Sequence, residues 1–100
     1  MTNSLILVGR LAREIEVKEK KGKEYAEIVL AIPRNVKNEE GIYETDFIPV
    51  AIWGGIANNV KEYCRKGDII GVRGRVEVVE DKIVVIAEKV TFLSSKRSEE

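Results

Sequence analysis

The chain contains no histidine and a single cysteine, Cys64, and these two shortages limit its chemistry. Without histidine it lacks the commonest general base and the Ser–His and Cys–His pairs of nucleophilic enzymes. A disulfide within the chain is excluded, and a zinc site built from cysteine and histidine is not expected. We therefore expect no enzymatic activity, no metal and no cofactor, and we expect Cys64 to pack as a small hydrophobic residue.

The sequence also has no excess of charge and no long apolar run. Its 17 Lys and Arg residues balance its 17 Asp and Glu residues, so any site for a polyanion must be local. No signal peptide and no run of about 18 apolar residues is present, so we expect a cytoplasmic protein without membrane contact. One hundred residues predict one domain. So short a chain buries a modest fraction of its surface, and oligomerisation would stabilise it.

Aromatic residues make up only 6% of the chain, yet the only tryptophan and one of the two phenylalanines fall in one stretch, residues 47–53. Its period-two alternation predicts a β-strand. The aliphatic residues of one parity form an ordinary core face: Ile48, Val50 and Ile52. Phe47 and Trp53 point to the opposite face, where aromatic rings are a candidate platform for stacked bases. The alternative is that both rings are buried in a second core layer or a subunit interface.

Four further segments are predicted as strands by their alternation and by the turn residues between them. They are residues 4–13, 24–32, 68–79 and 83–93. The first is apolar on both faces, so it is either central or covered by a partner subunit. We expect it to run long and to curve as far as Val17, as a strand does when a small barrel closes. Gly9 interrupts it and predicts a bulge or a bend.

Residues 56–66 have helical spacing instead, with apolar residues at positions 56, 57, 60, 63 and 64 on one face. Gly67 is expected at the C′ position of this helix, and Gly54 and Gly55 are expected to break the preceding strand. The order is then three strands, a helix and two strands. This all-β order is that of a five-stranded Greek-key barrel of the OB type. We assign residues 1–93 to it and residues 94–100 to a disordered polar tail.

OB barrels bind oligonucleotides or oligosaccharides on the face of their second and third strands, and basic side chains flank that face here. Arg73 and Arg75 share one parity about 7 Å apart, a spacing that can follow a nucleic-acid backbone. The alternative is a solvated face of mixed charge, to which Glu77 belongs. The other candidates lie in the charged turn of residues 18–23 and the flexible loop of residues 34–44: Lys21, Lys23, Arg34, Lys37 and Tyr43. Each of these two sets either contacts bound nucleic acid or is only solvated.

Four motifs resemble those of bacterial single-stranded DNA-binding proteins, in the same order and spacing. They are residues 5–11 (LILVGRL), 47–54 (FIPVAIWG), 59–68 (NVKEYCRKGD) and 72–76 (VRGRV). The resemblance covers residues 1–93 and implies an OB fold, a homotetramer and single-stranded DNA wrapped by basic and aromatic residues. At the matching positions it implies that Phe47 and Trp53 stack on bases and that Arg10, Arg73 and Arg75 are basic contacts.

The chain departs from this family at Val36, where members often carry another tryptophan. It departs again at Glu77, Glu80 and Asp81, where they often carry basic or aromatic residues. Residues 94–100 include acidic residues but no hydrophobic residue that could anchor a partner. We therefore do not expect this segment to recruit replication and repair proteins. We therefore keep two hypotheses. The first is a binder of single-stranded DNA that protects it in replication, recombination or repair. The second is an OB-fold primosome-accessory or protein-interaction subunit, similar to a short dimeric primosomal protein, that binds DNA weakly.

Overall fold

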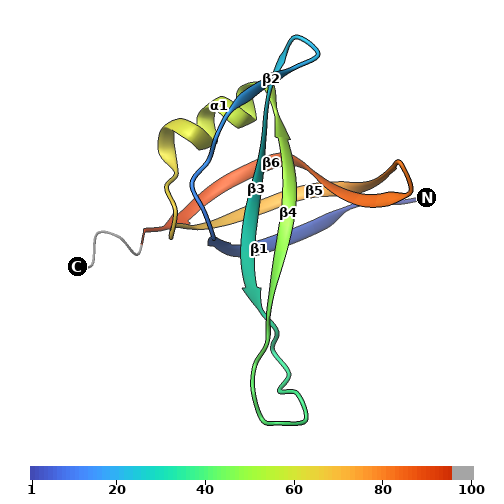
Figure 1. Ribbon diagram of the computed structural model, residues 1–100, viewed down its shortest axis with the longest axis vertical. Coiled ribbons are helices and arrows are strands. Elements are labelled where there is room, and N and C mark those ends of the chain that lie inside the picture. Colours follow the sequence, from blue (N-terminus) through green and yellow to red (C-terminus); the bar gives the residue numbers. More distant parts are fainter. Residues whose placement is uncertain (96–100) are drawn as a thin grey trace.

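The strands of this chain curl into a closed barrel that carries one helix, as a computed structural model describes for residues 1–95 (Figure 1). The elements are β1 (Leu5–Leu11), β2 (Lys18–Lys20), β3 (Lys23–Pro33), β4 (Thr45–Trp53), α1 (Gly54–Tyr63), β5 (Ile69–Val79) and β6 (Lys82–Ser94). Five of these strands build the barrel, and α1 lies between the third and the fourth of them. The predicted OB-type barrel is thereby confirmed. The remaining strand, β2, has three residues and lies within the turn predicted at residues 18–23.

The barrel closes because β1 pairs with two different strands. The neighbours in the sheet are β1-β5-β6-β4-β3-β2, and β1 also pairs with β3 at Arg10↔Ala31 and Leu11↔Leu30. This change of partner occurs beside Gly9, where a Cβ atom would lie 2.7 Å from Cγ1 of Ile32. The glycine predicted to mark a bend therefore allows β1 to approach β3 closely. The expected continuation of this strand to Val17 is wrong, because β1 ends at Leu11.

The core has the composition that the alternation predicted. The inward-facing residues of β3 and β4 that are fully buried are Ala26, Ile28, Leu30, Val50 and Ile52. Ala57 and Val60 of α1 and the buried side chain of Cys64 close one side of this cluster. Burying each large aliphatic side chain contributes about 1.5–3 kcal/mol, so this cluster is the main source of stability.

The helix differs from its prediction at both ends. The two glycines end β4 at Trp53, as predicted, but they form the first turn of the helix, which begins at Gly54 and not at Ile56. It ends at Tyr63, because Cys64 adopts an extended conformation with φ of −120°. Gly67, with φ of 96°, lies in a later turn and not at the C′ position. Tyr63, expected on the buried face, is 66% exposed.

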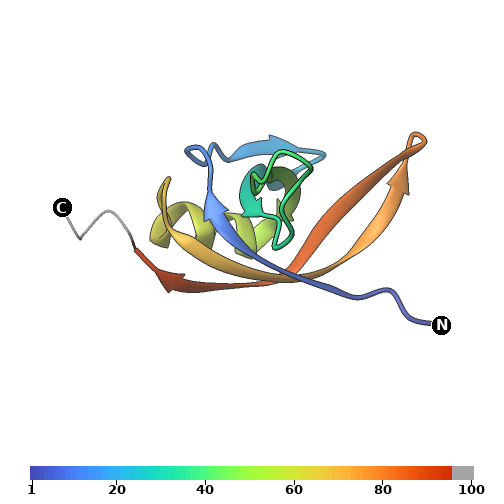
Figure 2. The same cartoon turned by 90° about the horizontal axis from the view of Figure 1, so that it is seen from below.

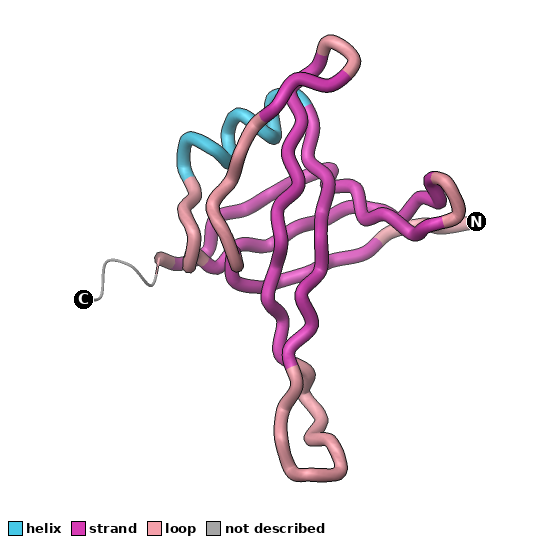
Figure 3. Tube along the Cα trace, viewed as in Figure 1, coloured by secondary structure: helices cyan, strands magenta, loops and turns pink. Residues whose placement is uncertain are grey.

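Three hairpins project from the barrel, and they give the molecule a flat cross shape of 47 × 40 × 21 Å (Figures 1 and 3). The β2–β3 hairpin and the β3–β4 loop lie at opposite ends of the long β3–β4 pair, and the β5–β6 hairpin extends to one side. Figure 2 shows the thin dimension of the cross. Val78 and Ile83 are 72% and 74% exposed because they lie on the β5–β6 hairpin beyond the barrel.

Strand β6 continues to Ser94, one residue into the predicted tail, and residues 96–100 of that tail lie outside the described residues. Within residues 1–95, the structure contains no helix with the length and apolar character needed to span a membrane.

Candidate nucleic-acid interface

The outward face of β3 and β4 forms a row that we call the outer track. It consists of the side chains at positions 25, 27, 29 and 31 of β3 and at positions 47, 49, 51 and 53 of β4. The antiparallel register pairs Tyr25 with Trp53 at one end and Ala31 with Phe47 at the other. Six residues at about 3.4 Å per residue put Trp53 and Phe47 about 20 Å apart. The two predicted stacking residues therefore share a face but mark its two ends, with Pro49 and Ala51 between them.

At the first end, Trp53 packs against Tyr25. The ring centroids are 4.5 Å apart and the planes are tilted by 54°. The Lys20 ammonium lies 4.7 Å from the Tyr25 ring centroid, within the range of a cation–π interaction. Burial raises the pKa of the Tyr25 phenol, and the negative charge of Glu27 raises it further. All three side chains thus form a packed unit before any ligand arrives.

Tyr25 and Lys20 were not among the predicted site residues. Tyr25 has the parity of an outward residue, and this signal was present in the sequence. The sequence did not reveal the register between β3 and β4, and only the pairing Tyr25↔Trp53 brings the two rings together. The pairing Lys18↔Tyr25 likewise places the lysine-rich hairpin beside them. Lys21 and Lys23, which were predicted, lie exposed in the same hairpin.

At the other end, Phe47 is 64% exposed, so its ring is not buried in a second core layer of this chain. Nearby, Arg34 is bound by two carboxylates: its Nη2 lies 3.0 Å from Oδ1 of Asp46, and its Nη1 lies 3.1 Å from Oε1 of Glu44. The hydrogen bond from Arg34 holds the pKa of the Asp46 carboxyl below its usual value. The Arg34 charge is therefore already balanced within the protein.

The loop expected to be flexible contains a turn fixed by hydrogen bonds. Oδ1 of Asn38 accepts hydrogen bonds from the N–H groups of Glu40 and Ile42, at 2.8 and 3.0 Å. The Lys37 ammonium lies 5.5 Å from the Tyr43 ring centroid. The loop therefore presents a lysine and a tyrosine together beyond the Phe47 end of the outer track.

The basic residues of the other strands have different surroundings. Arg75 forms ion pairs with Glu77 at 2.7 Å and Glu88 at 3.0 Å, which raise its pKa. It pairs with Ile86, which in turn pairs with Ala51 in the middle of the outer track. Arg75 is therefore near the track, but its charge is balanced by carboxylates.

Arg73 lies on the face formed by β1, β5 and β6, where it pairs with Ile6 and Lys89. The structure does not bring it to Trp53. Nη1 of Arg10 donates a hydrogen bond of 2.8 Å to the carbonyl of Gly67, so this guanidinium links two segments of the chain. Arg10 also pairs with Ala31, which pairs with Phe47, so it lies beside the Phe47 end of the outer track, while Arg75 lies in a row that crosses the middle of the track.

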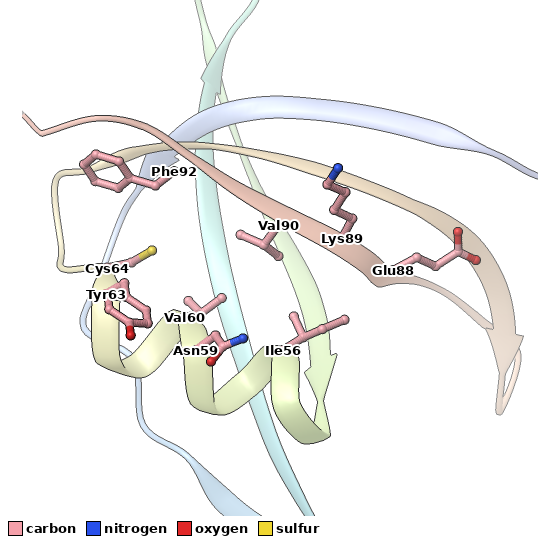
Figure 4. Close-up of a pocket in the computed structure, with 9 residues that line it drawn as sticks. All are labelled: Ile56, Asn59, Val60, Tyr63, Cys64, Glu88, Lys89, Val90 and Phe92. Carbon is pink, nitrogen blue, oxygen red and sulfur yellow. The ribbon is translucent and has the colours of Figure 1, made fainter.

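A hollow of about 430 Å³ lies elsewhere, between α1 and β6 (Figure 4). Ile56 and Val60 line it from the helix, and Val90 and Phe92 line it from β6. It contains none of the predicted site residues. Within residues 1–95, no cluster of three or more His, Cys, Asp or Glu side chains could hold a metal ion.

Comparison with known proteins agrees with this geometry. The model of the single-strand binding protein family matches residues 2–93. The chain is 36% identical over 106 residues to single-stranded DNA-binding protein 1 of Clostridium acetobutylicum, and this match covers 95% of the chain and 96% of that protein. It is 37% identical over 78 residues to the single-stranded DNA-binding protein of Streptococcus mutans, covering 77% of the chain and 48% of that protein. The chain thus spans nearly all of the first relative and about half of the second.

Solved structures share the fold at lower identity. The SSB domain of a Synechococcus protein superposes with a TM-score of 0.74 at 19% identity, covering 91% of this chain and 96% of that one. A deletion mutant of the single-stranded DNA binding protein from Thermus aquaticus gives a TM-score of 0.75 at 23% identity, covering 95% of this chain and 52% of that one. At these identities the superpositions support the barrel and not the details of the site.

Proposed function

Because the chain belongs to the single-strand binding protein family, we propose that it binds single-stranded DNA without catalysis and with little sequence preference. The observation that carries this proposal is the outer track, with Trp53 at one end and the exposed Phe47 at the other. A base stacked on an aromatic ring contributes about 1–3 kcal/mol. Stacking does not read the edges of bases, so the protein would protect DNA of any sequence in replication, recombination or repair.

Basic side chains around the track supply the phosphate contacts in this proposal. Lys21, Lys23 and Lys37 lie exposed at its two ends, with Tyr43 beside Lys37. Arg34 and Arg75 contribute only if DNA displaces their carboxylates. Arg10 lies beside the Phe47 end of the track, whereas Arg73 lies on the face of β1, β5 and β6 and is remote from the track. Each phosphate contact on a single strand adds about −0.7 to the slope of log K against log salt, so binding weakens as salt rises.

A second copy of the chain covers the face of β1, β5 and β6 in this proposal. Ile6, Val8 and Leu93 are 73%, 50% and 51% exposed there, and they line a shallow hollow of about 280 Å³. We propose a homotetramer, with a homodimer as the alternative, located in the cytoplasm with the nucleoid. Light scattering should show an oligomer that Ile6→Lys dissociates and Ile42→Lys, an exposed loop variant, does not. A monomeric unmodified protein would contradict the oligomer.

The second candidate function is a protein-interaction subunit that binds DNA weakly, such as a primosome accessory. The observation that favours it is the pairing of Arg34 and Arg75 with carboxylates, together with the acidic residues Glu80 and Asp81 at the end of the β5–β6 hairpin. These charges leave fewer cations for phosphate than the number of basic residues implies.

Trp53 fluorescence distinguishes the two functions. The protein is titrated with oligothymidine of about 35 nucleotides, longer than the roughly 4–16 nucleotides that one OB fold occupies. We expect strong quenching at low salt that weakens at high salt. No quenching, together with no mobility shift in a gel, would contradict DNA binding and favour the second function.

A further inference from the structure

Resting on the proposed DNA binding, we propose that Lys20, Tyr25 and Trp53 form one nucleotide subsite. In this subsite the base lies on Trp53 and the adjoining phosphate is held by Lys20. Tyr25 is a positioning residue that contacts both Trp53 and Lys20. The subsite uses three strands, because Lys18 of β2 pairs with Tyr25 of β3, which pairs with Trp53 of β4. Lys20 lies two residues beyond Lys18 and therefore on the same face of the sheet.

Tyr25 is the shared contact of this unit. Its ring centroid is 4.5 Å from that of Trp53 and 4.7 Å from the Lys20 ammonium. Side chains that are fixed before binding lose less conformational entropy when the ligand arrives. Lysine in particular has a long flexible stem, so the aromatic ring below it limits where its charge can lie.

The two rings cannot enclose a base between them. A base between two parallel rings needs about 7 Å, twice the usual carbon–carbon contact of about 3.5 Å, whereas these centroids are 4.5 Å apart and tilted by 54°. A base must therefore stack on the part of Trp53 that Tyr25 leaves uncovered. Tyr25 then supports the indole from one side while the base contacts the other.

The charge of Lys20 is available for a phosphate. Among residues 1–95, no carboxylate lies within salt-bridge distance of its ammonium, in contrast to Arg34 and Arg75. The residues beside it in the hairpin, Lys21 and Lys23, add to the positive potential. Lys20 is therefore an unbalanced cation that is already oriented beside the proposed stacking residue.

The test compares binding of oligothymidine over a series of salt concentrations. The variants are Lys20→Gln, Tyr25→Leu and Tyr25→Phe, and Lys82→Gln is the matched control that removes the same charge from the first residue of β6. We expect Lys20→Gln to lower the salt slope by about 0.7 more than Lys82→Gln does, the share of one phosphate on a single strand. Tyr25→Leu should lower the slope similarly and weaken binding about two- to tenfold. Tyr25→Phe keeps the ring and should bind as the unmodified protein does.

Two results would overturn the subsite while leaving DNA binding intact. One is an equal salt slope for Lys20→Gln and Lys82→Gln. The other is a weaker Tyr25→Leu protein with an unchanged slope, which would mean that Tyr25 only supports the sheet. If thermal unfolding shows that Tyr25→Leu does not fold, Tyr25→Ile, with a strong strand former, replaces it. Failure of the unmodified protein to bind would instead overturn the proposed function, and the subsite with it.

Discussion

The two ends of the outer track use similar residues in different ways. Each end has an aromatic residue of β4 and a lysine that lies over a tyrosine ring, Lys20 over Tyr25 and Lys37 over Tyr43. At one end Trp53 is packed against its tyrosine, whereas at the other Phe47 is 64% exposed and shows no ring contact within residues 1–95. The difference teaches that aromatic content alone does not define a stacking site. The ring that is held in place before binding loses less entropy when a base stacks on it.

The largest expected effect is that of Trp53→Ala. Removing a stacking ring should weaken binding of oligothymidine by about 1–3 kcal/mol, which anisotropy of a labelled oligonucleotide measures. Tyr63→Ala removes another exposed ring, on α1, and should bind normally. An equal loss from Lys21→Ala would show that charge and not stacking dominates this end of the track.

Phe47→Ala should weaken binding less, by about 1 kcal/mol, the lower end of the range for a stacked base. Its ring is exposed and unsupported, so the conformational entropy lost when the ring is ordered offsets part of its stacking energy. The same anisotropy titration measures this loss, with Phe92→Ala as the control for removing an exposed phenylalanine. A loss of binding as large as that of Trp53→Ala would contradict the proposed difference between the two ends of the track.

Asp46→Asn tests the balanced charge at the Phe47 end. It removes one of the two carboxylates that bind Arg34, so the guanidinium becomes more available to phosphate. We expect binding about two- to threefold tighter at low salt, with a steeper salt slope. Asp81→Asn makes the same change of charge in the β5–β6 turn and serves as the control. Tightening by both variants alike would indicate a general effect of net charge.

The smallest effect concerns acid stability. The pKa of Asp46 is lowered in the folded state by Arg34. Its contribution to stability is therefore fully present above the unfolded pKa of about 3.9 and is lost as pH falls through the lower folded value. We expect the unmodified protein to have a slightly higher Tm than Asp46→Asn at neutral pH, and the gap to close in acid. Because the pair is exposed, solvent screening keeps this gap small. A gap that persists in strong acid would contradict the ion pair as its cause.

Local sequence patterns determined most of the fold. The period-two alternation of residues 24–32 and 47–53 predicted the core-facing side chains of β3 and β4, and Ala26, Ile28 and Ile52 are buried as predicted. Ala51, which has the outward parity, is buried as well. The order of strands and the single helix were sufficient for the OB-type barrel. The ends of α1 were predicted less well, since a helix end depends on how the chain leaves it, here through the extended Cys64.

The sequence by itself therefore determined the barrel, its core faces and the outward position of Phe47 and Trp53, because side-chain parity is a local property of a strand. Only the tertiary structure decided which outward residues meet. The pairing of Tyr25 with Trp53, the carboxylates on Arg34 and Arg75, and the separate face of Arg73 all depend on register between strands. Register is set by long-range pairing and by turn geometry, and no single strand carries that information.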